Sequence, residues 1–127
     1  MDLSEQTHTA RARRRLDERE RARAEGLEEM RHRALQEAEA IVAMIAAEYG
    51  PERIYQWGSV LRPGGFKEYS DVDIAVEGVG DARAFFSMLA VAEKMTRFPL
   101  DLVQIERIEP EYAEDIRQHG RVVYEKR

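Results

Sequence analysis

The pattern of polar and apolar residues changes at Gly26. Residues 10–26 are mostly charged, and Leu16 is their one large apolar residue. Opposite charges recur there at the four-residue spacing that makes side chains neighbours on a helix. A helix that is polar on every side gains little from packing. We therefore predict a solvent-exposed helical extension over residues 1–26, with a break at Gly26.

After Gly26, apolar residues repeat at three- and four-residue steps, which predicts a helix that faces a core. They are Leu27, Met30, Ala34, Ala38, Ile41 and Ile45. Gly50-Pro51 should end this helix, because glycine adopts left-handed backbone angles and proline cannot continue the helical hydrogen bonds. The chain is thus expected to begin with a long helical region that leads into a domain over residues 27–127.

The rest of the chain alternates between short strand patterns and short helix patterns. Strands are predicted at 53–57, 71–76, 100–105 and 122–124, and helices at 82–96 and 110–120. Asp81 is placed to cap the first of these helices, and Pro110 to begin the second. This order predicts an α/β fold: a small mixed sheet with helices mainly on one face and a site on the open face.

Composition narrows the possible chemistry. The 127 residues are enough for one compact domain with a modest core, and the absence of cysteine excludes disulfides and thiolate metal sites. The formal charge is -5, from 20 Lys and Arg against 25 Asp and Glu, which is the reverse of a general nucleic-acid-binding protein. No stretch approaches the ~18 apolar residues of a membrane span. We expect a cytoplasmic protein.

Three carboxylates lie where the predicted strands would bring them together. Asp71 and Asp73 are two residues apart, so both point to the face opposite Val72 and Ile74. Asp101 lies within an apolar strand, where an unpaired acid is costly. If the third strand lies beside the second, the three carboxylates repel one another unless a cation separates them. They are candidate ligands for one or two Mg²⁺ ions, which suit phosphoryl transfer.

Candidate phosphate donors precede the carboxylates in the chain. Gly58 and Ser59 follow the first predicted strand, where glycine lets the backbone approach a ligand and serine supplies a hydroxyl and an amide. Arg62 is placed to add a guanidinium contact to a phosphate. We therefore predict nucleotide binding by Gly58, Ser59 and Arg62.

These motifs resemble the signature of nucleotidyltransferases of the DNA polymerase β superfamily. Gly58-Ser59 is followed after eleven residues by Asp71-Val72-Asp73, and then by Asp101 within Leu100–Val103. The segment 116–125 is similar to the end of the minimal members, so the resemblance covers about residues 27–127. It implies a polymerase β-like fold, contacts from Gly58 and Ser59 to a triphosphate, and Asp71 and Asp73 as metal ligands. By the same resemblance, Asp101 is the third carboxylate that activates the acceptor hydroxyl.

The resemblance also implies a function. Many minimal members are similar to antitoxins that are encoded beside a HEPN-domain toxin and inactivate it by transferring AMP from ATP to a toxin tyrosine. The expectation is therefore a magnesium-dependent protein adenylyltransferase with ATP as co-substrate and a HEPN toxin as partner.

Three alternatives remain at this point. The chain could be a non-catalytic antitoxin or assembly subunit that acts by binding. It could modify a small aminoglycoside-like molecule, although a chain this short lacks the extra domain that would enclose one. The arginines of residues 11–15 could contact nucleic acid, but the acidic residues among and after them favour a solvated helical face.

Overall fold

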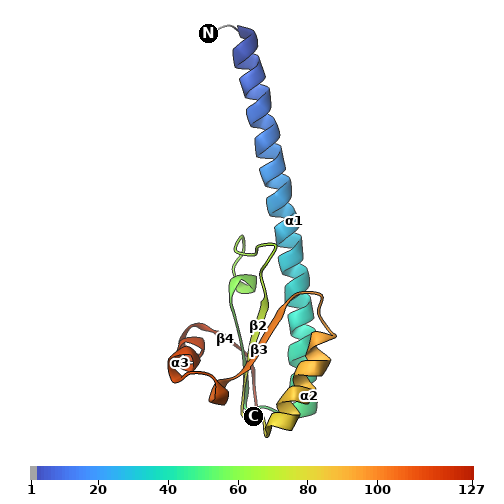
Figure 1. Ribbon diagram of the computed structural model, residues 1–127, viewed down its shortest axis with the longest axis vertical. Helices are drawn as coiled ribbons and strands as arrows, with labels where there is room; N and C mark the ends of the chain where they lie inside the picture. Colours follow the sequence, from blue (N-terminus) through green and yellow to red (C-terminus); the bar gives the residue numbers. More distant parts are fainter. Residues whose placement is uncertain (1–2) are drawn as a thin grey trace.

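A computed structural model describes residues 3–127 of the chain (Figure 1). The elements, in chain order, are α1 (Leu3–Tyr49), β1 (Arg53–Trp57), the 3-10 turn η1 (Ser59–Leu61), β2 (Val72–Glu77), α2 (Ala82–Glu93), β3 (Leu100–Gln104), the 3-10 turn η2 (Ile105–Arg107), α3 (Pro110–His119) and β4 (Arg121–Glu125). This order confirms the α/β fold class. Each strand and helix predicted after Gly50 is present, with bounds that shift by a few residues.

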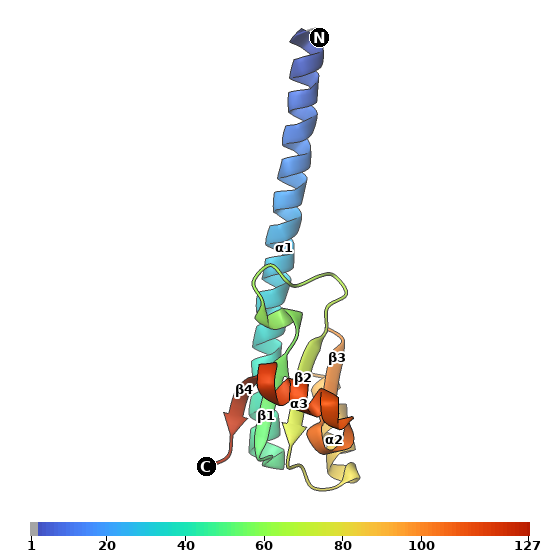
Figure 2. The same cartoon turned by 90° about the vertical axis from the view of Figure 1, so that its left-hand side faces the viewer.

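The first helix corrects one prediction, because α1 is a continuous helix of 47 residues that passes through Gly26. A glycine inside a helix costs about 1 kcal/mol relative to alanine, which is too little to end a helix that both flanking segments favour. The polar N-terminal part of α1 projects from the body into solvent, as Figures 1 and 2 show. The domain boundary after residue 26 stays a prediction.

The four strands form one mixed sheet in the order β3-β2-β1-β4 (Figure 2). β2 and β3 run parallel, whereas β1 is antiparallel to both β2 and β4. The register places Asp73 opposite Trp57 of β1 and beside Asp101 of β3. The position of the candidate site therefore follows from the strand pairing.

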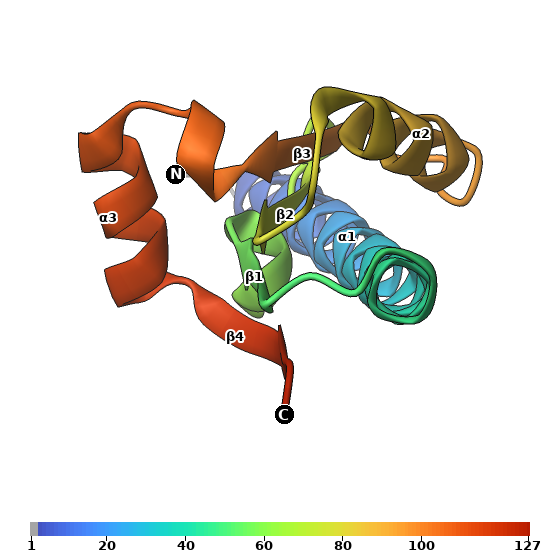
Figure 3. The ribbon, with the colours of Figure 1, turned by 90° about the horizontal axis from the view of Figure 1, so that it is seen from below.

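The two faces of the sheet are covered differently, as the view along the sheet in Figure 3 shows. One face carries the main core, in which Val72, Ile74 and Val76 of β2 pack with apolar residues of α1 and α2. The other face carries a smaller cluster under α3: Tyr55, Ala75, Ile105, Ala113 and Ile116. Because side chains alternate along a strand, Asp73 lies on the same face as Ala75. Helices thus lie mainly on the face opposite the carboxylates.

Local chemistry sets the helix ends. The Asp81 side chain accepts a hydrogen bond of 2.8 Å from the backbone N–H of Ala84, which confirms it as the cap of α2. Pro110 begins α3, as predicted. Within residues 3–127, no helix has both the length and the apolar character to cross a membrane.

Candidate functional site

The structure brings the three predicted carboxylates together. Asp71 directly precedes β2, Asp73 is the second residue of β2, and Asp101 is its register partner on the parallel strand β3. Neighbouring strands lie about 4.8 Å apart, so the two register partners are adjacent on one face of the sheet. Among residues 3–127, no Lys, Arg or His side chain pairs with any of the three.

The electrostatics of the cluster reflect this crowding. Burial, followed by the negative charges of Asp101 and Asp71, raises the pKa of Asp73 to about 7. Burial and the charge of Asp71 also raise the pKa of Asp101. At neutral pH the three groups therefore resist carrying three charges at once, and a cation would relieve that repulsion.

Gly58 is required by two independent constraints. Its φ is 90°, a backbone conformation that side-chain-bearing residues rarely adopt. In addition, a Cβ atom at this position would collide with the carboxylate of Asp73. Glycine therefore allows the end of β1 to lie directly against the carboxylate cluster.

Ser59 begins the turn η1 and holds the loop closed. Its hydroxyl donates a hydrogen bond of 2.9 Å to Ser70 Oγ, which also accepts one of 2.8 Å from the backbone N–H of Lys67. Ser70 directly precedes Asp71 in the chain. The Ser59 hydroxyl thus links the two ends of the loop between β1 and β2, beside the first carboxylate.

Arg62 lies apart from the carboxylates. The residue is exposed, and its side chain folds back over Gly65. Within the described part of the chain its guanidinium forms no hydrogen bond or ion pair. The structure thus gathers Gly58, Asp71, Asp73 and Asp101 into one place, with Ser59 next to them, and leaves Arg62 outside.

Two residues that sequence reasoning missed hold the loop against α1. The buried Arg31 donates a hydrogen bond of 3.0 Å to the carbonyl of Val60 and pairs with Glu28 at 2.7 Å. Glu28 also accepts a hydrogen bond of 3.2 Å from the backbone N–H of Gly64. These two contacts, with Arg31 first, lower the pKa of Glu28 to about 2. The signal in the sequence was a charged residue, Arg31, on the apolar face of a helix.

An aromatic pair beside the carboxylates was missed as well. Tyr112 of α3 packs edge-on against Trp57, with ring centroids 6.2 Å apart and planes at 87°. Burial, followed by the charges of Asp101 and Asp73, raises the pKa of Tyr112. The periodicity of apolar residues in α3 could not predict this contact, because the contact depends on how α3 packs against the sheet.

The metal prediction rests on donor chemistry. Within residues 3–127, no three His, Asp or Glu side chains stand in an arrangement that could hold a metal ion. Asp71, Asp73 and Asp101 nevertheless fit a hard cation such as Mg²⁺ in their donor chemistry, since they offer only oxygen donors. Burial, followed by neighbouring negative charge, raises the pKa of Asp73 and of Asp101. The oxygen donors of these residues are therefore of the kind that Mg²⁺ prefers.

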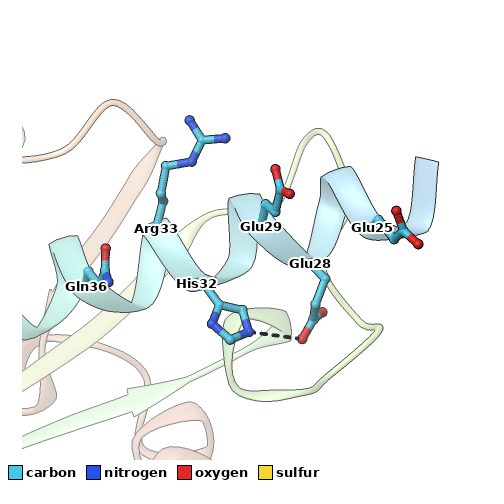
Figure 4. Close-up of a pocket in the computed structure, with 6 residues that line it drawn as sticks. All are labelled: Glu25, Glu28, Glu29, His32, Arg33 and Gln36. Atoms are coloured by element: carbon cyan, nitrogen blue, oxygen red, sulfur yellow. Dashed lines mark ion pairs between the residues drawn. The ribbon is translucent and has the colours of Figure 1, made fainter. Parts of the chain in front are cut away.

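A second hollow, of about 740 Å³, lies along α1 and is lined by acidic residues and a histidine. It is a weaker candidate for a ligand-binding site than the carboxylates of β2 and β3. Figure 4 shows that all six lining residues stand on one stretch of α1: Glu25, Glu28, Glu29, His32, Arg33 and Gln36. Glu28 is already paired with Arg31 and lies near His32. A single exposed helix face does not enclose a ligand, so the carboxylates of β2 and β3 remain the candidate site.

The fold of the chain is similar to that of several solved protein structures. No model of a protein family and no curated protein matches the chain. Solved structures do match it, among them the MntA-HepT toxin-antitoxin, with a TM-score of 0.55 and 17% identity over 72% of this chain and 73% of that chain. A toxin-antitoxin structure with AMP-PNP matches with a TM-score of 0.57 and 20% identity, over 70% and 74% of the two chains.

A third match is the tri-AMPylated Shewanella oneidensis HEPN toxin in complex with MNT antitoxin, with a TM-score of 0.55 and 18% identity over 73% of each chain. The chain has the minimal nucleotidyltransferase fold. This finding confirms the fold and the likeness to MNT antitoxins that the three motifs predicted. At this level of identity, the likeness concerns the fold.

Substitution of Gly58 tests whether the close approach of β1 to Asp73 is needed. Gly58→Ala should weaken binding of magnesium and AMP-PNP by at least ~10-fold, because its Cβ displaces the Asp73 carboxylate. Gly64→Ala is the matched control, since Gly64 has a φ of 76° but nothing within 4 Å of its Cβ position. Isothermal titration calorimetry measures both. Equal losses in the two variants would show that backbone strain alone matters.

The raised pKa of Asp73 predicts a pH-dependent stability. The pKa of the Asp73 carboxyl is about 7 in the folded protein and near 4 in the unfolded chain. As pH rises, the unfolded chain therefore loses the carboxyl proton at a lower pH than the folded protein does. Stability of the metal-free protein is therefore lost as pH rises from ~4 through ~7. Asp73→Asn removes this dependence and should be more stable than the wild type at pH 8 by on the order of 1 kcal/mol, after allowance for solvent screening.

Urea unfolding of the wild type and Asp73→Asn in the presence of a chelator, at pH 4 and pH 8, measures this difference. The gain of the variant should be small at pH 4 and larger at pH 8. A gain that does not change with pH would contradict the assigned pKa.

Proposed function

We propose that the chain is a magnesium-dependent nucleotidyltransferase that transfers AMP from ATP to a tyrosine of a HEPN-domain toxin and thereby acts as its antitoxin. The observation that carries this proposal is the register of β2 and β3, which sets Asp73 beside Asp101 with Asp71 next to them. Three crowded carboxylates without a cationic side chain suit a metal-bound triphosphate. ATP as co-substrate would place the reaction in the cytoplasm.

Each residue has a defined part in the proposed reaction. Gly58 lets the phosphates approach the backbone, and the amide of Ser59 is a donor to them. The Ser59 hydroxyl becomes a second donor if it turns away from Ser70 Oγ. Asp71, Asp73 and Asp101 would hold Mg²⁺, which supplies charge neutralisation for the phosphates when bound. Arg62 remains a proposed phosphate contact that would require its exposed side chain to turn toward the nucleotide.

The transfer itself exchanges one P–O bond for another. The acceptor tyrosine oxygen attacks the α-phosphorus, the bond from that phosphorus to the bridging oxygen breaks, and pyrophosphate leaves. The tyrosine proton passes to the carboxylate of Asp101, which the resemblance assigns to activation of the acceptor hydroxyl.

Two of the structural matches support the choice of nucleotide and acceptor. One contains AMP-PNP, and another contains a HEPN toxin that carries AMP. Among residues 3–127, α3 is the helix that shares the face of the sheet with the carboxylates, and the rest of that face is open. A partner protein is therefore a better fit for the open side than an aminoglycoside-like molecule.

A binding-only antitoxin is the second candidate. It is favoured by the finding that, within residues 3–127, the acidic and histidine side chains form no ready metal-binding group. In that case the chain would neutralise its partner by association, and the carboxylates would contribute at most to nucleotide binding.

Mass measurement on the co-expressed pair separates the two candidates. The chain is produced together with the HEPN-domain protein encoded beside it, and intact masses are recorded. We expect an AMP-sized gain on the partner, which should disappear with Asp71→Asn/Asp73→Asn because the nucleotide loses its metal ligands. Asp17→Asn removes an exposed aspartate on the projecting part of α1 and should leave the gain intact.

An unmodified partner that still forms a stable complex would contradict transfer and favour the binding-only function. An equal mass gain with Asp71→Asn/Asp73→Asn would show that these carboxylates are not the catalytic site.

A further inference from the structure

We propose that the hydroxyl of Tyr112 is an internal acceptor, so that the chain transfers AMP to itself as well as to a partner. This inference rests on the proposed nucleotidyltransferase function and adds a modification site to it. The site lies on α3, the helix that covers part of the carboxylate-bearing face (Figure 3).

The position of Tyr112 follows from three linked contacts. Its ring packs edge-on against Trp57, at a centroid distance of 6.2 Å. Trp57 is the register partner of Asp73, which in turn is the register partner of Asp101. Because register partners present their side chains on the same face of the sheet, the Tyr112 ring lies on the face that carries Asp73 and Asp101.

The accessibility of Tyr112 also suits an acceptor. The residue is 40% exposed, so its side chain is held by Trp57 but is not enclosed. The edge-on contact with Trp57 fixes the position of the Tyr112 ring. A partly exposed hydroxyl on the face of the candidate metal-binding carboxylates suits a nucleophile that a triphosphate bound there can reach.

The other four tyrosines of the chain are placed differently. The Tyr55 hydroxyl donates to Glu77 at 3.2 Å, and that of Tyr49 is bonded to Ser87 at 2.8 Å. Tyr124 lines a groove between β4 and α1 on the opposite face of the sheet. Tyr69 is 80% exposed in the loop that leads to Asp71, and its ring packs on no other aromatic ring among residues 3–127.

Transfer of AMP to Tyr112 forms and breaks the same kinds of bond as transfer to a partner tyrosine. Tyr112 Oη bonds to the α-phosphorus of ATP, the bond to the bridging oxygen breaks, and pyrophosphate leaves with its electron pair. Asp101 takes the phenolic proton. No oxidant or further co-reactant is needed, and the product is an AMP ester of Tyr112 with free pyrophosphate.

A competing role for Tyr112 is that of a stacking surface for the adenine base, together with Trp57. The two roles depend on different parts of the side chain. Stacking needs the ring, which Tyr112→Phe keeps, whereas modification needs the hydroxyl, which that variant lacks. The variant should fold, because Tyr112 is partly exposed and the substitution removes one oxygen atom.

The purified full chain, incubated with ATP and Mg²⁺ without a partner, tests the proposal by intact mass and peptide mapping. We expect an AMP-sized gain that maps to Tyr112, at a rate per molecule that does not change with protein concentration. The gain should be absent in Tyr112→Phe and in Asp101→Asn, while the control Tyr69→Phe should retain it.

Three outcomes would overturn the proposal: no gain in the wild type, a gain on another residue, or a gain that persists in Tyr112→Phe. A wild type that modifies its HEPN-domain partner but not itself refutes the internal acceptor and leaves the proposed function intact. A wild type that modifies neither protein refutes both.

Discussion

Electrostatic repulsion among Asp71, Asp73 and Asp101 is the constraint on which the candidate site depends. The register of parallel strands β2 and β3 fixes two of the carboxylates side by side, and alternation along β2 adds the third. Burial and mutual charge raise the pKa of Asp73 to about 7. Packing of the apolar side of β2 holds the carboxylates in this unfavourable arrangement, and the proposed binding of a cation would relieve their repulsion.

The rest of the fold supplies the rigidity that this arrangement needs. The apolar side of β2 is fully buried against α1 and α2, so the strand cannot rotate to separate its acids. Arg31 and Glu28 hold the loop that follows β1 against α1, and Gly58 gives that strand end room beside Asp73. A short chain can therefore present a preorganised site on one face of its sheet.

Sequence alone located the carboxylates because local periodicity carries that information. Alternation along a strand set Asp71 and Asp73 on one face. Asp101 was a candidate because an unpaired acid within an apolar strand is costly, and its placement beside the other two required the strand order. Contacts between segments that are distant in the sequence could not be predicted. Residue spacing does not reveal the packing of Tyr112 on Trp57 or the hydrogen bond from Arg31 to Val60. The break expected at Gly26 was wrong because a local preference of about 1 kcal/mol does not overcome the continuous helix around it.

Binding of Mn²⁺, a paramagnetic substitute for Mg²⁺ at oxygen-ligand sites, tests the shared carboxylate site most directly. Electron paramagnetic resonance reports the free ion during titration of the protein in the presence of AMP-PNP. We expect saturable binding that weakens by at least ~10-fold in Asp73→Asn/Asp101→Asn. Equal affinity in the wild type and this variant would contradict it.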